Sequence, residues 1–403
     1  MHILFLSSWF PYPANNGSKI RVYNLLRGLA QRHEITLVSF TDRPGEPVPP
    51  QLKALCRQVY TVPEKPYNPT SLQALLGLFQ PKPRVLVDRY EPRMAEIIRR
   101  ELASGRCDLV IASQWYTASY LEGMQNVPAI FEEMEAGVFD EGPARLNPLQ
   151  RLRRALMIAK FRTYFRRLIP QFAACTVVSE VEREKVRSLV PHYPGLEVIP
   201  NAVGVDDYRD VREDPQPGQL IFTGSFTYAP NYDAMLWFVQ DILPRVRAEF
   251  PQASLTITGD HTGMPFPQVE NVRLAGFVDD VRPLIASSWA SIVPIRVGGG
   301  TRLKILEAMA LRTPVITTTK GAEGLDVRAE EHLLVADSPE DFAKAVIRLL
   351  SDSALRARLA ASGYELVKRK YDWKVVVPCF VELAERTAAG AAVQDLAFET
   401  KPE

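Results

Sequence analysis

The segment VGGGTRLKILEAMA combines a glycine run, two cations and one carboxylate in a single short stretch. Gly298, Gly299 and Gly300 follow an apolar run typical of a buried strand, and Thr301 is placed to cap the helix that we expect next. Glycines let a phosphate approach backbone amides, and the amides at a helix N-terminus lie along a dipole that favours anions. We therefore predict an anion-binding site at this loop.

Arg302 and Lys304 lie in the first turn of that expected helix. Cations are unfavourable there, because a helix start already carries about half a positive charge, so two of them indicate an anionic ligand. Glu307 follows in an otherwise apolar run, where a carboxylate needs a partner. We expect ribose hydroxyls in that place, since both can donate to one carboxylate. An internal pair with Lys304 or with a backbone donor is the alternative.

The elements that must position these residues follow a regular pattern. Short apolar runs alternate with longer amphipathic stretches, as in parallel sheets whose strands are joined by crossover helices. Strands are expected at residues 2–6, 35–40, 59–62, 109–112, 129–131 and 175–178, and in a second series at 220–223, 254–258, 272–274, 290–293, 315–318 and 332–335. The sequence therefore predicts an α/β fold with two doubly wound domains.

A polar, proline-bearing stretch at residues 203–219 separates the two series and has the composition of a linker. We place an N-terminal domain at residues 1–205 and a C-terminal domain at residues 206–374. A helix at residues 375–390 is expected to pack back on the N-terminal domain, and residues 391–403 to form a disordered tail.

Composition excludes several classes of protein. The 48 basic and 47 acidic residues nearly cancel, which gives no reason to expect a nucleic-acid partner. The four cysteines lie far apart without metal-ligand spacing, so we expect neither a disulfide framework nor a zinc site. No apolar run is long enough for a signal peptide or a membrane span, which predicts a cytoplasmic location. No metal or other cofactor is expected.

GGGTRLKILEAMALRTPVITTTKGAEGL resembles the donor-site signature of the retaining glycosyltransferases of family four, also called group 1. The stretches PYPANNGSKIRVYNLLRGLA, VIPN, LIFTGSFTYAPNYDAM and LAGFVDDVRPL match in order, so the resemblance covers nearly the whole chain. It implies the GT-B fold, in which two Rossmann-like domains face each other across a cleft.

The resemblance also implies an activity. Members of the family move a sugar from a nucleotide diphosphate sugar, such as a UDP-sugar, to a hydroxyl acceptor with retention. We expect this hexosyltransferase-type reaction to serve cell-surface polysaccharide or glycolipid synthesis, with a sugar or lipid-linked acceptor. A nucleotide-sugar epimerase of the same fold and a non-catalytic nucleotide-sugar-binding protein are the alternatives.

The family's donor residues are carried over position by position. Glu307 matches the second acid of the family's glutamate pair, at the ribose, whereas Gly299 replaces the first acid. The stretch GSFTYAPN lacks the family's basic residues, so the diphosphate role moves to Arg302 and Lys304, which complete the predicted catalytic set with Glu307. The other donor-binding residues are expected to be Gly17, Gly224, Ser225, Gly276, Phe277, Val278 and the loop from Gly298 to Thr301.

The acceptor side is less strongly indicated. Gln114 and Trp115 lie where the family commonly has a catalytic histidine. Glu133 and Glu135 follow a strand end, where ligand-facing groups of open α/β sheets lie. Solvated loop residues are an equally good explanation for these acids and for the cations of the first helix. We assign the following residues to the acceptor side: Lys19, Arg21, Gln114, Trp115, Glu133 and Glu135.

From Arg145 to Arg167 the chain holds eight basic residues and no acidic ones, interleaved with leucine and phenylalanine. This pattern predicts a basic amphipathic helix. Such a helix either packs on the N-terminal sheet with its basic face in water or lies on an anionic membrane surface. We expect the packed helix with a membrane contribution, so that the protein is peripheral on the inner face of the plasma membrane.

Overall fold

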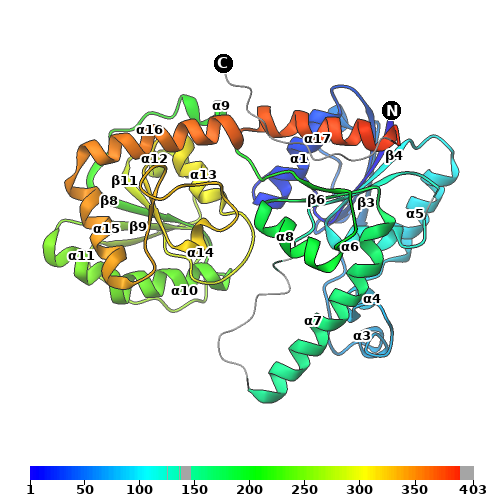
Figure 1. The fold of residues 1–403 in the computed structure, drawn as a ribbon, viewed down its shortest axis with the longest axis horizontal. Coiled ribbons are helices and arrows are strands. Elements are labelled where there is room, and N and C mark those ends of the chain that lie inside the picture. Colours follow the sequence, from blue (N-terminus) through cyan, green and yellow to red (C-terminus); the bar gives the residue numbers. More distant parts are fainter. Residues whose placement is uncertain (125, 136, 138–146, 391–403) are drawn as a thin grey trace. The chain divides into compact units, whose positions relative to one another are not determined.

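The computed structural model describes residues 1–124, 126–135, 137 and 147–390, which form two compact units (Figure 1). The first unit comprises Met1–Pro200 together with the chain from Val377 onward, and the second comprises Asn201–Val376. Each unit contains one parallel sheet with helices against it. The predicted α/β fold with two doubly wound, Rossmann-like domains is confirmed.

The sheet of the first unit has seven parallel strands in the order β3-β2-β1-β4-β5-β6-β7. The order reverses between β1 and β4, which pair with Ser7 opposite Ser113. Open α/β sheets bind ligands beyond the carboxyl ends of the strands at such a reversal. The strands are β1 (His2–Ser7), β2 (Glu34–Thr41), β3 (Gln58–Pro63), β4 (Leu109–Ser113), β5 (Ala129–Glu132), β6 (Ala174–Val177) and β7 (Leu196–Val198).

The helices of the first unit enclose a core of aliphatic and aromatic side chains, in which Phe5, Leu25 and Ile111 are fully buried. They are α1 (Gly17–Leu29), α2 (Pro50–Leu55), α3 (Leu72–Leu76), α4 (Arg84–Asp88), α5 (Pro92–Ala103), α6 (Gln114–Ala118), α7 (Pro148–Leu168) and α8 (Glu180–Leu189). The helix α17 (Trp373–Ala388) leads into this unit. A Cβ on Gly28 would lie 2.0 Å from Val377 Cγ1, so α17 packs directly on α1.

The sheet of the second unit has six parallel strands in the order β10-β9-β8-β11-β12-β13 and reverses between β8 and β11. The strands are β8 (Gln216–Thr223), β9 (Ser254–Thr258), β10 (Val272–Gly276), β11 (Ser288–Val293), β12 (Val315–Thr317) and β13 (Leu334–Val335). The helices are α9 (Asp206–Arg209), α10 (Ala229–Trp237), α11 (Leu243–Glu249), α12 (Arg282–Ala286), α13 (Leu303–Ala310), α14 (Thr319–Ala322), α15 (Pro339–Ser351) and α16 (Ser353–Lys370).

Helix α7 differs from the amphipathic helix that the sequence predicts. Its second half packs on the core of the first unit through Phe161, Phe165 and Leu168. Most residues of its first half are exposed, and this half extends beyond the sheet (Figure 1). At about 100° per residue, the leucines of the first half also lie roughly a third of a turn around the helix from the buried residues. One continuous apolar face is therefore absent from α7, and Arg145 lies outside the described residues.

Within the described parts of the chain, no helix combines the length and the apolar character that crossing a bilayer requires.

Candidate active site

The loop between β11 and α13 carries the predicted anion site of the second unit. Gly298 and Gly300 have φ values of +99° and +77°, in the left-handed region that favours glycine. A Cβ on Gly298 would also lie 2.8 Å from the hydroxyl oxygen of Tyr228. Gly298 is thus required by its backbone conformation and by the close approach of Tyr228, the residue that precedes α10.

Arg302 holds this loop from within. Its guanidinium is 8% exposed, and Nη2 donates to the Gly298 carbonyl at 2.7 Å while Nη1 donates to the Gly299 carbonyl. The sequence predicted that this cation lies on the diphosphate, whereas in the structure it is engaged by the loop itself. Arg302 therefore fixes the carbonyl oxygens of the glycine loop in place.

Thr301 does not cap α13, and that prediction is wrong. The helix begins at Leu303, with Arg302 at the N-cap position and no side-chain cap hydrogen bond. The Leu303 amide bonds the Thr301 carbonyl, which makes a tight turn before the helix starts. The Thr301 hydroxyl is buried and has no hydrogen-bond partner in the part of the chain that the structure describes. Buried polar atoms normally have partners, so this hydroxyl is available to a ligand.

Lys304 extends from α13 to the end of β8. Its Nζ donates to Asn231 Oδ1 at 3.0 Å and lies 4.0 Å from the centre of the Phe222 ring. A Cβ on Gly224, whose φ is +150°, would lie 2.7 Å from the same Nζ. Burial, and then the charge of Arg302, lower the pKa of Lys304 to about 7 against the opposing effect of Glu307. Among the described residues it makes no ion pair, so its charge lacks a counterion.

Glu307 lies one turn further along α13. Its Oε1 accepts a long hydrogen bond of 3.4 Å from the Tyr208 hydroxyl. Burial raises the pKa of Glu307, although Lys304 and Tyr208 act in the other direction. The internal ion pair with Lys304 that we weighed is not formed within 4 Å in the described structure. The assignment of Glu307 to the ribose stays a prediction. Because Tyr208 bonds Glu307, we add Tyr208 to the predicted site.

The predicted donor-binding residues Gly276, Phe277 and Val278 lie at the same edge of the second sheet. β10 ends at Gly276, whose φ is +71° and whose carbonyl accepts from the Gly259 amide at 2.8 Å. Phe277 follows with its side chain 75% exposed, and Val278 is half-buried. Ser225, after β8, donates to the Asp260 carbonyl at 3.0 Å. An exposed aromatic ring at a strand end is suited to stack on a base.

Two residues missed by the sequence analysis complete this edge. Asn231 lies in the first turn of α10 and is 7% exposed, with its amide nitrogen bonded to the Ser225 carbonyl at 2.8 Å. Asn231 therefore both orients Lys304 and fixes the turn after β8. Tyr208 lies in α9 and contacts Glu307, which is 99 residues further along the sequence. The only sequence signal for Asn231 was a polar residue just inside a helix start.

In the first unit, a hydrogen-bonded chain links the ends of β1, β4 and β5. Gln114 accepts from Trp9 Nε1 at 2.8 Å and donates to Glu133 Oε2 at 3.2 Å. Its amide nitrogen is also 3.4 Å from the Ser18 hydroxyl. Gln114 and Glu133 have φ values of +70° and +56°, which are uncommon for residues with side chains. Such backbone strain is concentrated at functional sites.

Glu133 has the most perturbed carboxyl of this group. It is 3% exposed, and burial together with Glu132 and Glu135 raises its pKa to about 8 despite the nearby Arg21. It is therefore mostly protonated at neutral pH and able to donate a hydrogen bond. Trp9, which the sequence analysis did not select, is 40% exposed and bonds Gln114.

Arg21 lies in the core, although we assigned it to the acceptor side. Its side chain is fully buried, with Nε donating to Glu132 Oε1 at 2.6 Å and Nη1 to the Pro200 carbonyl at 3.1 Å. Glu133 Oε1 lies 3.9 Å from the same Nε. This position leaves no surface for an acceptor, because the Arg21 side chain is paired with Glu132 in the core.

The other predicted residues of the first unit are distributed unevenly. Gly17 opens α1, and the Lys19 amide donates to Asn16 Oδ1 at 3.0 Å, so these two lie at the helix start as expected. Trp115 instead packs edge-on against Phe161, with ring centres 5.9 Å apart, and faces the core.

Comparison with known proteins identifies the family. Residues 15–207 match the family described as Glycosyltransferase Family 4, and residues 217–352 match the one described as Glycosyl transferases group 1. The chain belongs to the group 1 glycosyltransferases of family four. The resemblance that the sequence analysis drew from GGGTRLKILEAMA is thereby confirmed at the level of the family.

The chain is similar in sequence to two named proteins. It is 31% identical over 210 residues to phosphatidyl-myo-inositol mannosyltransferase of Mycobacterium leprae, a match that covers 49% of this chain and 55% of that protein. It is 30% identical over 118 residues to the lipopolysaccharide core biosynthesis glycosyltransferase LpsE of Rhizobium meliloti, covering 28% and 33%. The chain therefore spans about half the length, or less, of these relatives.

Solved structures resemble the chain over nearly its whole length. Sucrose-phosphate synthase from Thermosynechococcus elongatus superimposes with a TM-score of 0.72 at 18% identity, covering 97% of this chain and all of that one. Anabaena HepE in complex with UDP and glucose superimposes with a TM-score of 0.61 at 16% identity, covering 95% and 98%. These likenesses confirm the GT-B fold.

Gly298→Ala should weaken the binding of a nucleoside diphosphate at least about tenfold, or ~1.4 kcal/mol, because the loop must shift to admit the methyl group. Gly263→Ala is the matched control, since Gly263 also has a positive φ of +72° but nothing within 4 Å of its Cβ. Calorimetric titration with UDP, GDP and ADP measures the effect. Equal affinities for the two variants would contradict the assignment of the loop.

Arg21→Met should destabilise the first unit by about 3–5 kcal/mol, because Glu132 and Glu133 then lack their buried cation. The deficit should grow as pH rises, because the folded-state pKa of Glu133, already raised by burial, then lies further above its unfolded value. Denaturant unfolding at several pH values measures this. Arg27→Met, an exposed change on the same helix, should have little effect, and an equal loss in both variants would refute the pairing argument.

Proposed function

We propose that this glycosyltransferase transfers a sugar from a nucleotide diphosphate sugar to a hydroxyl of its acceptor, with retention of the anomeric configuration. The observation that carries the proposal is Lys304, a half-buried lysine without an ion-pair partner among the described residues, which lies beside Gly224 at the reversal of the second sheet. A diphosphate supplies the missing negative charge. Known relatives are named as glycosyltransferases, which supports this choice of ligand.

The donor is placed along one edge of the second unit. Its diphosphate lies at Lys304 and the loop from Gly298 to Gly300. The adjacent Thr301 hydroxyl, which has no hydrogen-bond partner among the described residues, donates to it. The ribose hydroxyls bond Glu307, and the base stacks on Phe277. UDP is the first nucleotide to test, since UDP and UDP-glucose are the ligands named for Anabaena HepE.

The chemistry rests on charge rather than on a metal ion. The bond between the anomeric carbon and the diphosphate oxygen breaks, and negative charge develops on the leaving diphosphate. Lys304 and the start of α13 offset that charge from fixed positions, which is the most effective form of electrostatic catalysis. The acceptor hydroxyl attacks from the same face, and its proton passes to the leaving phosphate oxygen.

The acceptor-side groups belong to the first unit. Gln114 and Glu133 lie at the carboxyl ends of its strands, where a protonated Glu133 can donate a hydrogen bond to a sugar oxygen. We infer a sugar or lipid-linked acceptor in glycolipid or polysaccharide synthesis, supported by the names of the mannosyltransferase and of LpsE. The enzyme then works at the inner face of the plasma membrane, which it contacts through the exposed half of α7.

The decisive experiment has two stages. Thermal unfolding is measured with UDP-, GDP- and ADP-sugars, because a ligand stabilises only the state that binds it. The stabilising donor is then incubated with enzyme and lipid extract, and nucleotide release and sugar incorporation are followed. A sugar changed without any acceptor would indicate an epimerase, and binding without nucleotide release a non-catalytic binding protein. Either result would refute the proposal.

Lys304→Met should lower turnover about a hundredfold or more, as loss of one charge-stabilising group does in other enzymes. Because the pKa of Lys304 is about 7 in the free protein, a diphosphate bound at about pH 8 should draw a proton onto its amine. Calorimetry in buffers of different ionisation enthalpy measures this uptake. Lys344→Met, which changes a lysine that is 77% exposed, should retain both turnover and proton uptake. Undiminished uptake in Lys304→Met would contradict the role.

A further inference from the structure

Trp9 differs from the other tryptophans of the chain because its ring is open to solvent. It lies two residues beyond the end of β1 and is 40% exposed. Among the described residues, no aromatic ring and no cation is stacked on its indole. The other four tryptophans are buried or packed against a neighbouring side chain: Trp115 on Phe161, Trp237 on Phe342, Trp289 under Arg356, and Trp373 in the core.

The Trp9 ring is nevertheless fixed in orientation. Its one polar atom, Nε1, donates to Gln114 Oε1 at 2.8 Å. The backbone is held as well, because the Trp9 amide donates to Ser7 Oγ at 3.2 Å and Ser7 Oγ donates to the Trp9 carbonyl at 2.6 Å. With its polar atom bonded, the indole presents apolar ring surface to the solvent.

A chain of hydrogen bonds connects this ring to the core of the first unit. Gln114 Nε2 donates to Glu133 Oε2 at 3.2 Å, and the Glu133 amide donates to Thr176 Oγ1 at 2.9 Å. Glu133 is buried and lies 3.9 Å from Arg21 Nε. Gln114 and Glu133 both adopt left-handed backbone conformations, which cost free energy in residues with side chains. A tryptophan that only covered a surface would not need such a support.

Neutral polar groups border the exposed ring. The Gln114 side chain and the Ser18 hydroxyl are both half-buried, and Gln114 Nε2 lies 3.4 Å from Ser18 Oγ. Burial raises the pKa of Glu133 to about 8, so the carboxyl that supports Gln114 is mostly uncharged at neutral pH. These groups suit a neutral ligand with several hydroxyls better than a phosphate. We name Trp9, together with Gln114 and Ser18, the Trp9 platform.

A pyranose ring has a shape that matches the Trp9 platform. One face of such a ring carries C–H groups and is apolar, whereas its hydroxyls project from the rim. Binding sites for small molecules typically combine aromatic surface with a few placed polar groups. The indole supplies the aromatic surface, and the Ser18 hydroxyl can both donate to and accept from a sugar hydroxyl.

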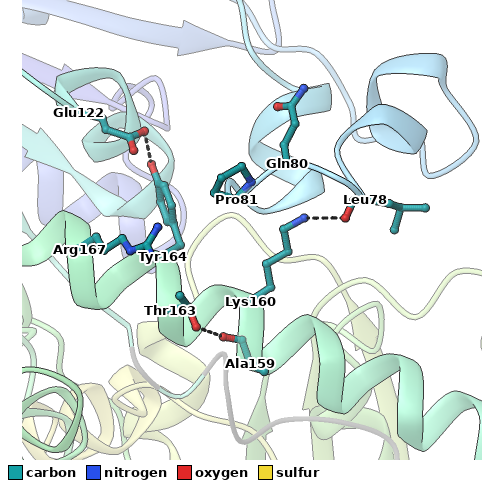
Figure 2. A pocket seen from close by; sticks show the side chains of 9 residues that line it. All are labelled: Leu78, Gln80, Pro81, Glu122, Ala159, Lys160, Thr163, Tyr164 and Arg167. Carbon is teal, nitrogen blue, oxygen red and sulfur yellow. Dashed lines mark hydrogen bonds between the residues drawn. The ribbon is translucent and has the colours of Figure 1, made fainter.

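The first unit contains a second concavity of suitable size for a sugar. It is a hollow of about 500 Å³ between α7 and the turn after α3 (Figure 2). Its polar groups bond one another, because Tyr164 donates to Glu122 at 3.1 Å and Lys160 donates to the Leu78 carbonyl at 3.2 Å. Tyr164 is 4% exposed and Lys82 lies over its ring. The residues that line the hollow therefore lack the open aromatic face of the Trp9 platform.

We propose that the Trp9 platform binds the terminal sugar of the acceptor, with the apolar face of a pyranose ring stacked on the indole and a sugar hydroxyl bonded to Ser18. The acceptor thus ends in a sugar ring, whether that sugar is free or carried by a lipid. Trp9 contacts the sugar, and Gln114 is a positioning residue that orients the indole. This inference rests on the proposed function, because an acceptor requires a transfer, but sugar binding at Trp9 is measured without a donor.

Saturation-transfer difference NMR with the full chain tests the proposal, since it detects weak binding and identifies the ligand protons that contact the protein. The probes are the methyl pyranosides of glucose, mannose, galactose and N-acetylglucosamine, compared with mannitol, which has hydroxyls but no ring. At least one pyranoside should bind, with the strongest signals from one face of its ring, and mannitol should not. Trp9→Ala should weaken that binding about tenfold or more, as removal of a central aromatic contact does.

Matched variants separate contact from general effects on the fold. Tyr67→Ala should bind the pyranoside like the parent, because Tyr67 is 39% exposed in the same unit but lies against Arg84. Trp9→Phe retains an aromatic face without the bond to Gln114, so it should keep part of the affinity even where Trp9→Ala is unstable. Ala159→Phe fills the hollow of Figure 2 and should leave pyranoside binding unchanged.

The positioning role of Gln114 has its own test. Gln114→Met removes the acceptor of the indole N–H and should weaken pyranoside binding several-fold, with a less pronounced difference between the two faces of the sugar ring. Gln114→Glu again accepts from the indole, and protonated Glu133 can donate to it, so this variant should recover binding below about pH 7. Equal binding by Gln114→Met and the parent would refute this role.

The proposal is overturned if none of the pyranosides binds, if Trp9→Ala binds them as the parent does, or if Ala159→Phe is the variant that loses binding. It is also overturned if uridine gives a signal that Trp9→Ala removes, since the platform would then hold a base. Donor-induced thermal stabilisation without pyranoside binding would refute this inference alone. Pyranoside binding at Trp9 without nucleotide release would support the sugar site and refute the proposed transfer.

Discussion

Charged groups that leave water need an opposite charge or hydrogen bonds, and both units depend on how that need is met. In the first unit, Arg21 is buried with Glu132 at 2.6 Å and a carbonyl at 3.1 Å, so the requirement is satisfied internally. In the second unit, Lys304 has one amide oxygen and the face of Phe222, and no carboxylate within 4 Å in the described structure. The first arrangement stabilises a fold, whereas the second leaves room for the anionic ligand that we propose.

The two parallel sheets decide where these groups lie. Each sheet reverses its strand order once, and the residues beyond the reversal cannot be covered by crossover helices that leave in opposite directions. Gln114 and Trp9 meet at the reversal of the first sheet, as Gly224 and Lys304 do at that of the second. Residues that are distant in sequence thus converge because the topology opens the sheet there. Positive φ values at Gln114 and Glu133 add a local cost that a purely structural loop would not need.

The strands were predictable because a sheet buried on both faces needs continuous apolar runs, which are visible locally. β7 was missed, since its three residues leave too short a signal. The site was predictable where backbone chemistry dictates residue type, as at Gly298 and Gly224, whose φ values require glycine. The prediction failed where a long side chain has several possible partners. Arg302 bonds its own loop, and Arg21 pairs with a carboxylate 111 residues away. Such choices depend on tertiary contacts that no local pattern records.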